Sequence, residues 1–241
     1  RGYNILLMDG QLDVAMISML EQKFEKSRFT RVDSDVIDRL IAKEEHKEAN
    51  LESNQREILS SVFRSQLPQI KKVEFNVETQ SLGENGAPIM ITQSEYMRRM
   101  KEMANIQAGM SFYGEMPNMY NLVLNADHKL VKQVLTDAGN SCKAALEPIE
   151  SEMANLNNRR KELQKAQEGK KTEDIPQAEK DELNDIEKKI SDETTKKQAV
   201  LGEYANGNKI IHQLIDLALL QNNMLKGEAL TNFVKRSIEL I

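Results

Sequence analysis

Three histidines and one cysteine are the side chains of this 241-residue chain best suited to acid–base or nucleophilic chemistry. Catalysis requires such groups to converge with a base or an orienting partner, and the sequence places no such partner beside His46, His128, His212 or Cys142. It also contains no phosphate-binding glycine loop and no metal-ligand spacing. We therefore expect no catalytic and no metal-binding residues, and we expect His128 to cap or pack a helix. A hydrolase or transferase that uses His128 and a carboxylate is the weaker alternative.

The composition of the chain excludes some classes of binding partner. The net charge is −5, and Lys and Arg are mixed among Asp and Glu, whereas a nucleic-acid-binding surface is typically clustered and basic. No apolar run approaches the roughly 20 residues that cross a bilayer. A single cysteine cannot form an internal disulfide, which favours an intracellular, reducing setting. We expect neither nucleic acid nor membrane as a partner.

Methionine is the most informative residue type in the sequence. Seven of the 12 methionines lie within thirty residues, between Met90 and Met119. An exposed methionine surface adapts to many apolar partners, because the side chain is unbranched and polarizable. The alternative, which the residues alone leave equally open, is that these side chains fill a loosely specified core. The candidate binding residues are Tyr96, Met97, Met100 and Met103 on a predicted helix over 94–107, and Met110, Phe112 and Tyr113 in the loop that follows.

Alternation of apolar and polar residues predicts the elements that would carry this surface. Residues 73–77 and 88–91 read as the two strands of a hairpin around a glycine-containing turn, and residues 119–124 as a third strand. A short helix over 126–135 follows, with Asn125 as its N-cap and Asp127 in its first turn. Upstream, residues 3–8 suggest a buried strand, and residues 35–66 a long helix that ends before Pro68.

Residues 141–205 differ in composition from the rest, since they are highly charged and contain a single aromatic residue, Tyr204. Apolar residues there recur at steps of three and four in two series, separated by a polar stretch at 168–176. This pattern is typical of two long antiparallel helices that form a coiled-coil hairpin. Three charged residues fall near core positions: Arg160, Glu193 and Lys197. We therefore expect a projecting arm in which the interface between the two helices is not fully apolar.

The chain closes with two predicted helices, over 209–225 and 228–241, separated at Gly227. The first is apolar almost all round, so it must be buried on every side. A two-fold bundle with a second copy of the chain would bury it, although packing on the chain's own sheet is an alternative. The predicted dimer contacts are Ile211, Leu214, Ile215, Ala218, Leu219, Leu230, Phe233, Val234 and Ile238.

Three segments resemble the bacterial branch of the heat-shock protein 90 chaperone family, high-temperature protein G. Residues 2–13 resemble the strand and acidic turn that close the family's middle domain, although Val14 and Ala15 replace the usual Glu and aromatic residue. Residues 121–131 resemble its Leu-Asn-Pro-Asp-His signature, with Ala126 in place of Pro. The last two helices match the family, without the customary Asp-Pro between them, at Ala218, Leu219, Leu220, Leu230, Phe233, Arg236 and Leu240.

The resemblance covers most of residues 1–140 and 206–241. Together with the residue patterns it predicts an α+β fold: a small three-stranded sheet with packed helices, an inserted antiparallel coiled-coil hairpin and a C-terminal helical dimer bundle. Residues 1–35 would end a middle domain, residues 36–140 and 206–241 would form a dimerisation and client-binding domain, and residues 141–205 would be the inserted hairpin. The opening at Arg1, close to a predicted strand, suggests a piece of a longer protein.

The same resemblance implies a cytoplasmic chaperone that homodimerises and binds unfolded or partly folded client proteins. In the family, ATP and Mg²⁺ bind an N-terminal domain, so we expect no cofactor and no ATPase activity in this chain. ATP-driven closure of the full-length protein would act on a client held between protomers. The competing function is that of a coiled-coil scaffold or adaptor that acts through residues 141–205.

Overall fold

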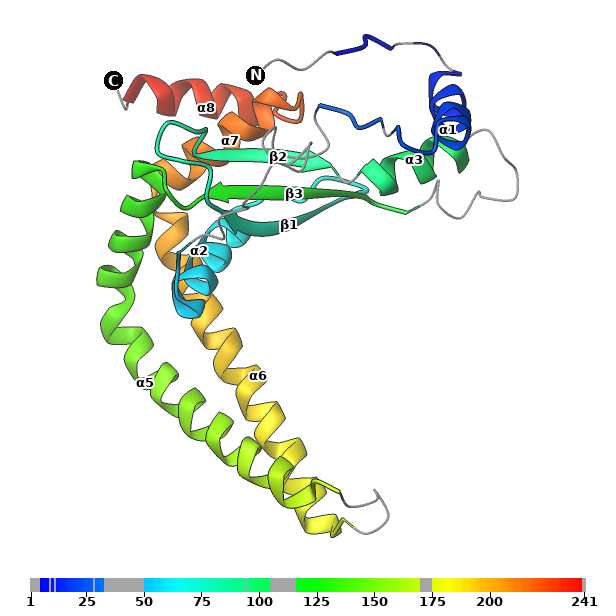
Figure 1. Cartoon of the computed structure of the whole chain (residues 1–241). Helices are drawn as coiled ribbons and strands as arrows, with labels where there is room; N and C mark the ends of the chain where they lie inside the picture. Colours follow the sequence, from blue (N-terminus) through cyan, green and yellow to red (C-terminus); the bar gives the residue numbers. More distant parts are fainter. Residues whose placement is uncertain are drawn as a thin grey trace.

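The computed structural model describes residues 5–8, 10, 12–27, 29–32, 50–93, 95–104, 116–169 and 175–239. Within these ranges the chain has the predicted α+β fold, with one small sheet and seven helices. Figure 1 shows the sheet and its helices as a body from which two long helices project as an arm. The predicted sites at 105–115, and His46, lie outside the described residues.

The sheet has three strands: β1 (Val73–Gln80), β2 (Ile89–Gln93) and β3 (Asn118–Asn125), in the order β1-β3-β2. β3 pairs in parallel with β1 and antiparallel with β2. The prediction that β1 and β2 form a hairpin is therefore wrong, although all three strands exist. β3 takes the central place because Leu122, Val123 and Leu124 are apolar in succession and fully buried, which suits a strand covered on both faces.

Helix α2 (Ser53–Ser65) packs against β1 and buries Ile58, Leu59, Val62 and Phe63 in the main core. It begins at Ser53 because Glu52 has an extended backbone, and the Glu52 N–H is bonded to Gln55 Oε1 at 3.0 Å. A single helix over 35–66 is thus wrong at residues 50–52, which are not helical, while residues 33–49 lie outside the described ranges.

Helices α1 (Asp13–Lys23) and α3 (Glu95–Ala104) lie side by side at one end of the sheet (Figure 1). The predicted buried strand over 3–8 is wrong for residues 5–8, which form no strand and expose 67–95% of Ile5, Leu6 and Leu7. The described sheet pairs only β1, β3 and β2 with one another, and residues 5–8 pair with none of these strands.

The arm consists of α5 (Lys129–Gln167) and α6 (Gln177–Asn206), which pack along each other as predicted. The short helix predicted over 126–135 is wrong, because α5 begins at Lys129 and continues without interruption through residue 141 to the arm. The N-terminal part of α5 and the C-terminal part of α6 contribute to the main core. A second, separate apolar cluster farther along the arm consists of Leu156, Leu163, Ile186 and Ile190.

Two helices complete the body, as the sequence predicts: α7 (Lys209–Gln221) and α8 (Glu228–Glu239). Asn208 caps α7, since its Oδ1 accepts hydrogen bonds from the N–H groups of Ile210 (3.0 Å) and Ile211 (3.2 Å). The chain turns between the helices at Gly227, whose φ of +61° favours glycine. α7 packs on β2 and α5, and α8 packs on α7.

Candidate protein-binding surfaces

Helix α3 carries the predicted client-binding residues at an end of the sheet. Tyr96 is 65% exposed, and Met97 and Met100 are half-buried. Met103 belongs to the same helix, but its side chain lies outside the described residues. The apolar side of α3 is therefore partly open to solvent at Tyr96 and partly packed at the two methionines.

Polar contacts hold α3 against its neighbours. Arg99 Nη1 donates to Glu21 Oε2 of α1 at 2.7 Å, and Arg99 also donates to the Phe29 carbonyl. Lys101 Nζ donates to Asn118 Oδ1 of β3 at 2.7 Å. Burial, and to a lesser degree the nearby charge of Lys72, lower the pKa of Lys101. These contacts hold α3 against α1 and β3 through polar side chains.

The predicted dimer residues fall into two groups. Those on α7 are already buried within the chain, with exposed fractions of at most 5%, because they pack in the main core: Ile211, Leu214, Ile215, Ala218 and Leu219. Those on α8 are more open, since Leu230 and Phe233 are half-buried, while Val234 and Ile238 are 48% and 69% exposed. A partner can therefore reach α8 in this conformation, but not the buried side of α7.

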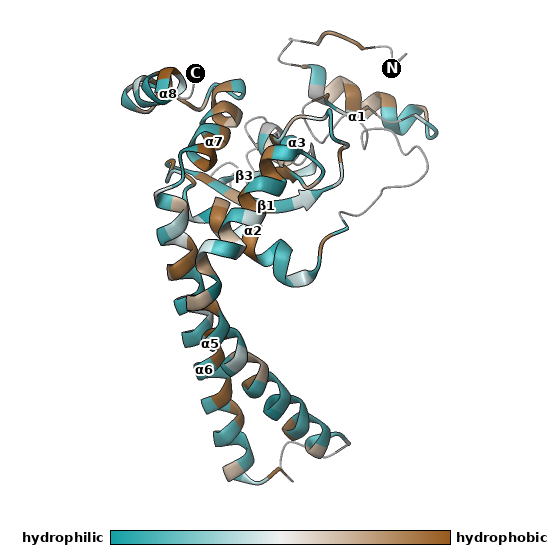
Figure 2. Ribbon diagram, turned by 90° about the vertical axis from the view of Figure 1, so that its left-hand side faces the viewer, coloured by the Kyte–Doolittle hydropathy of each residue, from teal (hydrophilic) through white to brown (hydrophobic). Residues whose placement is uncertain are grey.

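Two apolar residues on the other side of α7 were missed as candidate contacts. Leu217 and Leu220 are 39% and 37% exposed, and their spacing of three places them on one side of the helix. Figure 2 shows how strongly hydrophobic residues concentrate on α7, in contrast to the mostly hydrophilic surface of the arm. Because α7 is apolar almost all round, the sequence could not indicate which side the sheet covers.

Three polar contacts tie α8 to α7. Arg236 forms an ion pair with Asp216, Gln213 Nε2 donates to Ser237 Oγ at 2.6 Å, and Lys209 Nζ donates to Glu239 Oε2 at 2.7 Å. Burial raises the pKa of Asp216, although the charge of Arg236 opposes that rise. The contacts orient α8 on α7, with Val234 and Ile238 left open to solvent.

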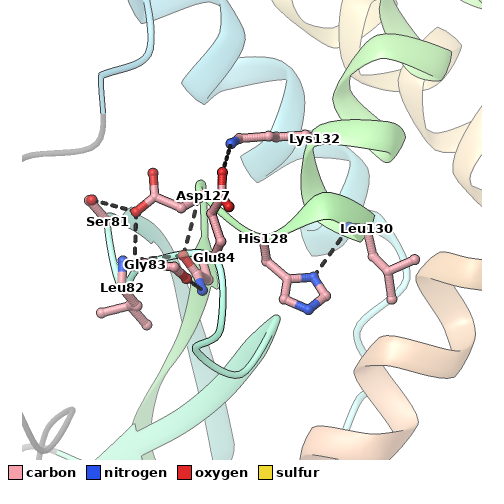
Figure 3. A network of polar contacts seen from close by, with 9 residues as sticks. Ser81, Leu82, Gly83, Glu84, Asp127, His128, Leu130 and Lys132 are labelled. Carbon is pink, nitrogen blue, oxygen red and sulfur yellow. Dashed lines mark hydrogen bonds and ion pairs between the residues drawn. The ribbon is translucent and has the colours of Figure 1, made fainter.

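His128 and its neighbours form a structural turn between β3 and α5 (Figure 3). His128 is the N-cap of α5, and its Nδ1 accepts a hydrogen bond from Leu130 N–H at 3.2 Å, which confirms the predicted capping role. Asp127 Oδ2 accepts from Ser81 Oγ at 2.6 Å and from Gly83 N–H at 2.9 Å. The carboxylate beside His128 thus closes the loop after β1.

His212 and Cys142 have structural surroundings as well. His212 Nε2 lies 3.1 Å from the Asn206 carbonyl, and burial raises the pKa of the Cys142 thiol, which makes the thiolate less accessible. Among the described residues, no group of three or more His, Cys, Asp or Glu side chains is arranged to hold a metal ion. None of the helices in the described ranges is long and apolar enough to span a membrane.

The full length of the chain aligns with bacterial proteins named chaperone protein HtpG. It is 69% identical over 241 residues to the protein of Bacteroides fragilis, 68% identical to that of Bacteroides thetaiotaomicron, and 46% identical over 243 residues to that of Porphyromonas gingivalis. The chain belongs to the HtpG family. It spans about 35% of the length of these curated relatives. No protein-family model and no solved structure matches it.

The most specific HtpG-like segment, residues 121–131, has a defined place in the fold. It comprises the end of β3, the turn at Ala126 and Asp127, and the first turn of α5. Ala126, where Pro is customary in the family, precedes the N-cap by two residues and donates its N–H to the Gln80 carbonyl at 2.8 Å. Proline could not donate this bond, so in this chain alanine adds a hydrogen bond between the turn and β1.

Proposed function

We propose that this chain is the part of an HtpG chaperone that homodimerises through α7 and α8 and binds unfolded or partly folded clients along α3. The observation that carries the dimer is the open apolar surface of the last two helices, with Leu217, Leu220, Val234 and Ile238 each more than a third exposed. Clustered exposed apolar residues are typical of protein-binding surfaces. A second copy, related by two-fold symmetry, would cover them with the same residues.

The proposal for α3 rests on its chemistry. Tyr96 and the methionines beside it offer an apolar, adaptable contact for clients of varied sequence, and 65% of Tyr96 is open to solvent. The polar contacts of Arg99 and Lys101 hold the helix in place without using the Tyr96 side chain. A client could therefore bind without detaching α3 from the sheet.

The wider mechanism belongs to the full-length protein in the bacterial cytoplasm. There, ATP and Mg²⁺ would bind outside the residues present here, and the dimer contact would keep two chaperone protomers at high effective concentration. Closure driven by ATP would then act on a client held between the protomers. The chaperone names of the relatives support this scheme.

Light scattering across a dilution series tests the dimer. The expected mass is twice the 27.5 kDa of the chain. Replacing both Val234→Asp and Ile238→Asp should shift the mass toward the monomer, because two charges would be buried in the apolar contact. Asn232→Asp is the matched control, since it adds a charge to an exposed position on the opposite side of α8 and should leave the mass unchanged. A wild-type chain that stays monomeric at high concentration would contradict the proposal.

Client binding needs a separate test. The triple variant Tyr96→Ser, Met97→Ser and Met100→Ser should weaken binding of a fluorescently labelled, chemically unfolded protein while the dimer mass is kept. Ile5→Ser with Leu6→Ser is the matched control, because it also removes exposed apolar side chains, but outside α3. Equal losses in both variants would contradict a role specific to α3.

A further inference from the structure

A buried lysine joins three helices at the base of the arm. Lys197 of α6 is 3% exposed. Its Nζ donates to Asn54 Oδ1 at 2.8 Å and to Glu57 Oε2 at 2.9 Å, both on α2, and lies 3.3 Å from Glu150 Oε1 on α5. A buried ammonium is tolerated only when it is paired and hydrogen-bonded, so these partners constrain the three helices at one point.

This polar layer separates two apolar clusters of the arm. On the body side, Leu146 of α5 and Leu201 of α6 belong to the main core. On the outer side, the second cluster begins at Leu156 and Ile190. Apolar packing is non-directional, whereas a polar group within a helical seam favours one register over others. The layer of Glu150 and Lys197 is therefore suited to fixing how the outer arm is aligned with the body.

Pro148 lies two residues before Glu150, inside α5. Proline has no N–H to donate to the carbonyl of Ala144, one turn earlier, and its ring crowds that carbonyl, so helices bend at such positions. Figure 1 shows α5 as a curved helix over its course from the body to the tip of the arm. Pro148, a position that favours a bend, and the polar layer thus occur at the same level of the arm.

Helix α2 contacts α6, and to a lesser extent α5, at this level. Gln66, just after α2, donates from Nε2 to the Gly202 carbonyl of α6 at 3.3 Å, which adds a second polar contact between α2 and α6. The outer arm beyond Glu150 has no comparable support, because its described contacts are those between α5 and α6. Its direction therefore depends on the few contacts at its base.

We infer that Lys197 is a positioning residue that locks the arm at the level of Pro148 and couples the arm's direction to α2. This goes beyond the proposed chaperone function, which assigns no role to the arm. The segment of α5 beyond Glu150 spans roughly 25 Å at 1.5 Å per residue. A change of about 10° at the base would move the tip by about 4 Å, so a small displacement of α2 would be amplified at the tip.

Distances between two spin labels test the inference. Labels on Lys71→Cys in the body and Lys165→Cys near the tip report the direction of the arm, and both positions are exposed. The native Cys142 is buried, and labelling of the parent chain checks that it stays unreacted. Mixing with excess unlabelled chain removes distances between protomers. We expect one narrow distribution for the wild-type arm.

Lys197→Met should broaden this distribution at least about twofold, given the expected tip displacement. The matched control is Lys196→Met, which removes the neighbouring lysine, an exposed side chain paired with Glu193 within α6. It should leave the distribution unchanged. If Lys197→Met keeps its helical circular dichroism and a wild-type distribution, the inference is overturned. If Lys197→Met does not fold, the same distances are measured in Glu57→Gln. A broader distance distribution in Glu57→Gln supports the inference, and an unchanged distribution overturns it.

Discussion

At the scale of single residues, Gly86 in the loop between β1 and β2 allows a close approach that no other residue permits. A Cβ atom there would lie 2.7 Å from the Leu82 carbonyl oxygen and 3.0 Å from Asn125 Nδ2. The first contact involves backbone, so the loop itself would have to shift. Gly86→Ala should therefore lower the free energy of unfolding by about 1–3 kcal/mol, measured by urea denaturation.

Gly139→Ala is the control for that substitution. Gly139 lies within α5, where an added Cβ meets nothing within 4 Å. Alanine is the better helix former, so this variant should raise the free energy of unfolding by up to about 1 kcal/mol. Two variants with equal stability would mean that the loop relaxes around Gly86→Ala.

Asn125 shows where residue-scale prediction from sequence ends. Its type and position before a helical pattern favour an N-cap, but His128 caps α5. Asn125 Oδ1 accepts one local hydrogen bond, from Asp127 N–H at 3.1 Å, but it also accepts from Leu82 N–H at 3.2 Å, and its Nδ2 donates to the Gly83 carbonyl at 2.9 Å. Leu82 and Gly83 are more than 40 residues away in sequence, and capping preferences describe only local contacts.

At the scale of elements, an ion pair between the arm helices makes their packing depend on pH. Arg159 Nε of α5 donates to Glu182 Oε1 of α6 at 2.7 Å, and this hydrogen bond is the main cause of the lowered pKa of Glu182. A lowered pKa means that the folded arm favours the ionised carboxylate. The resulting stabilisation is present above the ordinary value of 4.5 and is lost as the pH falls through the lowered pKa.

Glu182→Gln should therefore lower the thermal unfolding temperature at pH 7, and the difference from wild type should disappear on acidification. Both side chains are exposed, so the effect is small and weakens with added salt. Glu187→Gln, at an exposed position of the same helix, is the control. A difference that persists at low pH would point to lost packing and not to the ion pair.

Helices were more predictable than strand pairing. Steps of three and four, as from Met153 to Leu156 and from Ile186 to Ile190, predict the arm helices correctly. The wrong hairpin came from pairing strands that are neighbours in sequence. One signal could have prevented it: the uninterrupted apolar run Leu122-Val123-Leu124 indicates a central strand buried on both faces.

At the scale of the whole molecule, burial depends on which neighbours are present. Residues 5–8 have the apolar character of a buried strand, yet Leu7 is 95% exposed. Conversely, α7 buries Ile211 and Ile215 in the chain's own core and leaves Leu217 and Leu220 open. Hydrophobic patterns indicate which residues are suited to burial. They do not identify whether the chain's own core or another surface covers those residues.

Removal of the outer arm separates the chaperone from the scaffold alternative. Replacing residues 155–191 by a short Gly-Ser linker keeps Glu150 and Lys197 and removes Leu156, Leu163, Ile186 and Ile190, the whole of the second apolar cluster. The main core contains none of these four residues, so the body should stay folded, with native circular dichroism in the strand region. α3, α7 and α8 lie in the body, and the shortened chain should keep both its dimer mass and its affinity for the labelled unfolded protein.

A scaffold acting through the arm predicts the opposite outcome for binding. If the shortened chain folds and dimerises but loses the unfolded protein, the arm carries the binding surface and α3 does not. The triple Ser variant of Tyr96, Met97 and Met100 completes the comparison, because it alters α3 and leaves the arm intact. Binding that survives arm removal and fails in the α3 variant is the pattern expected of the chaperone, since the contacts then reside on the apolar side of a helix that the sheet and α1 hold in place.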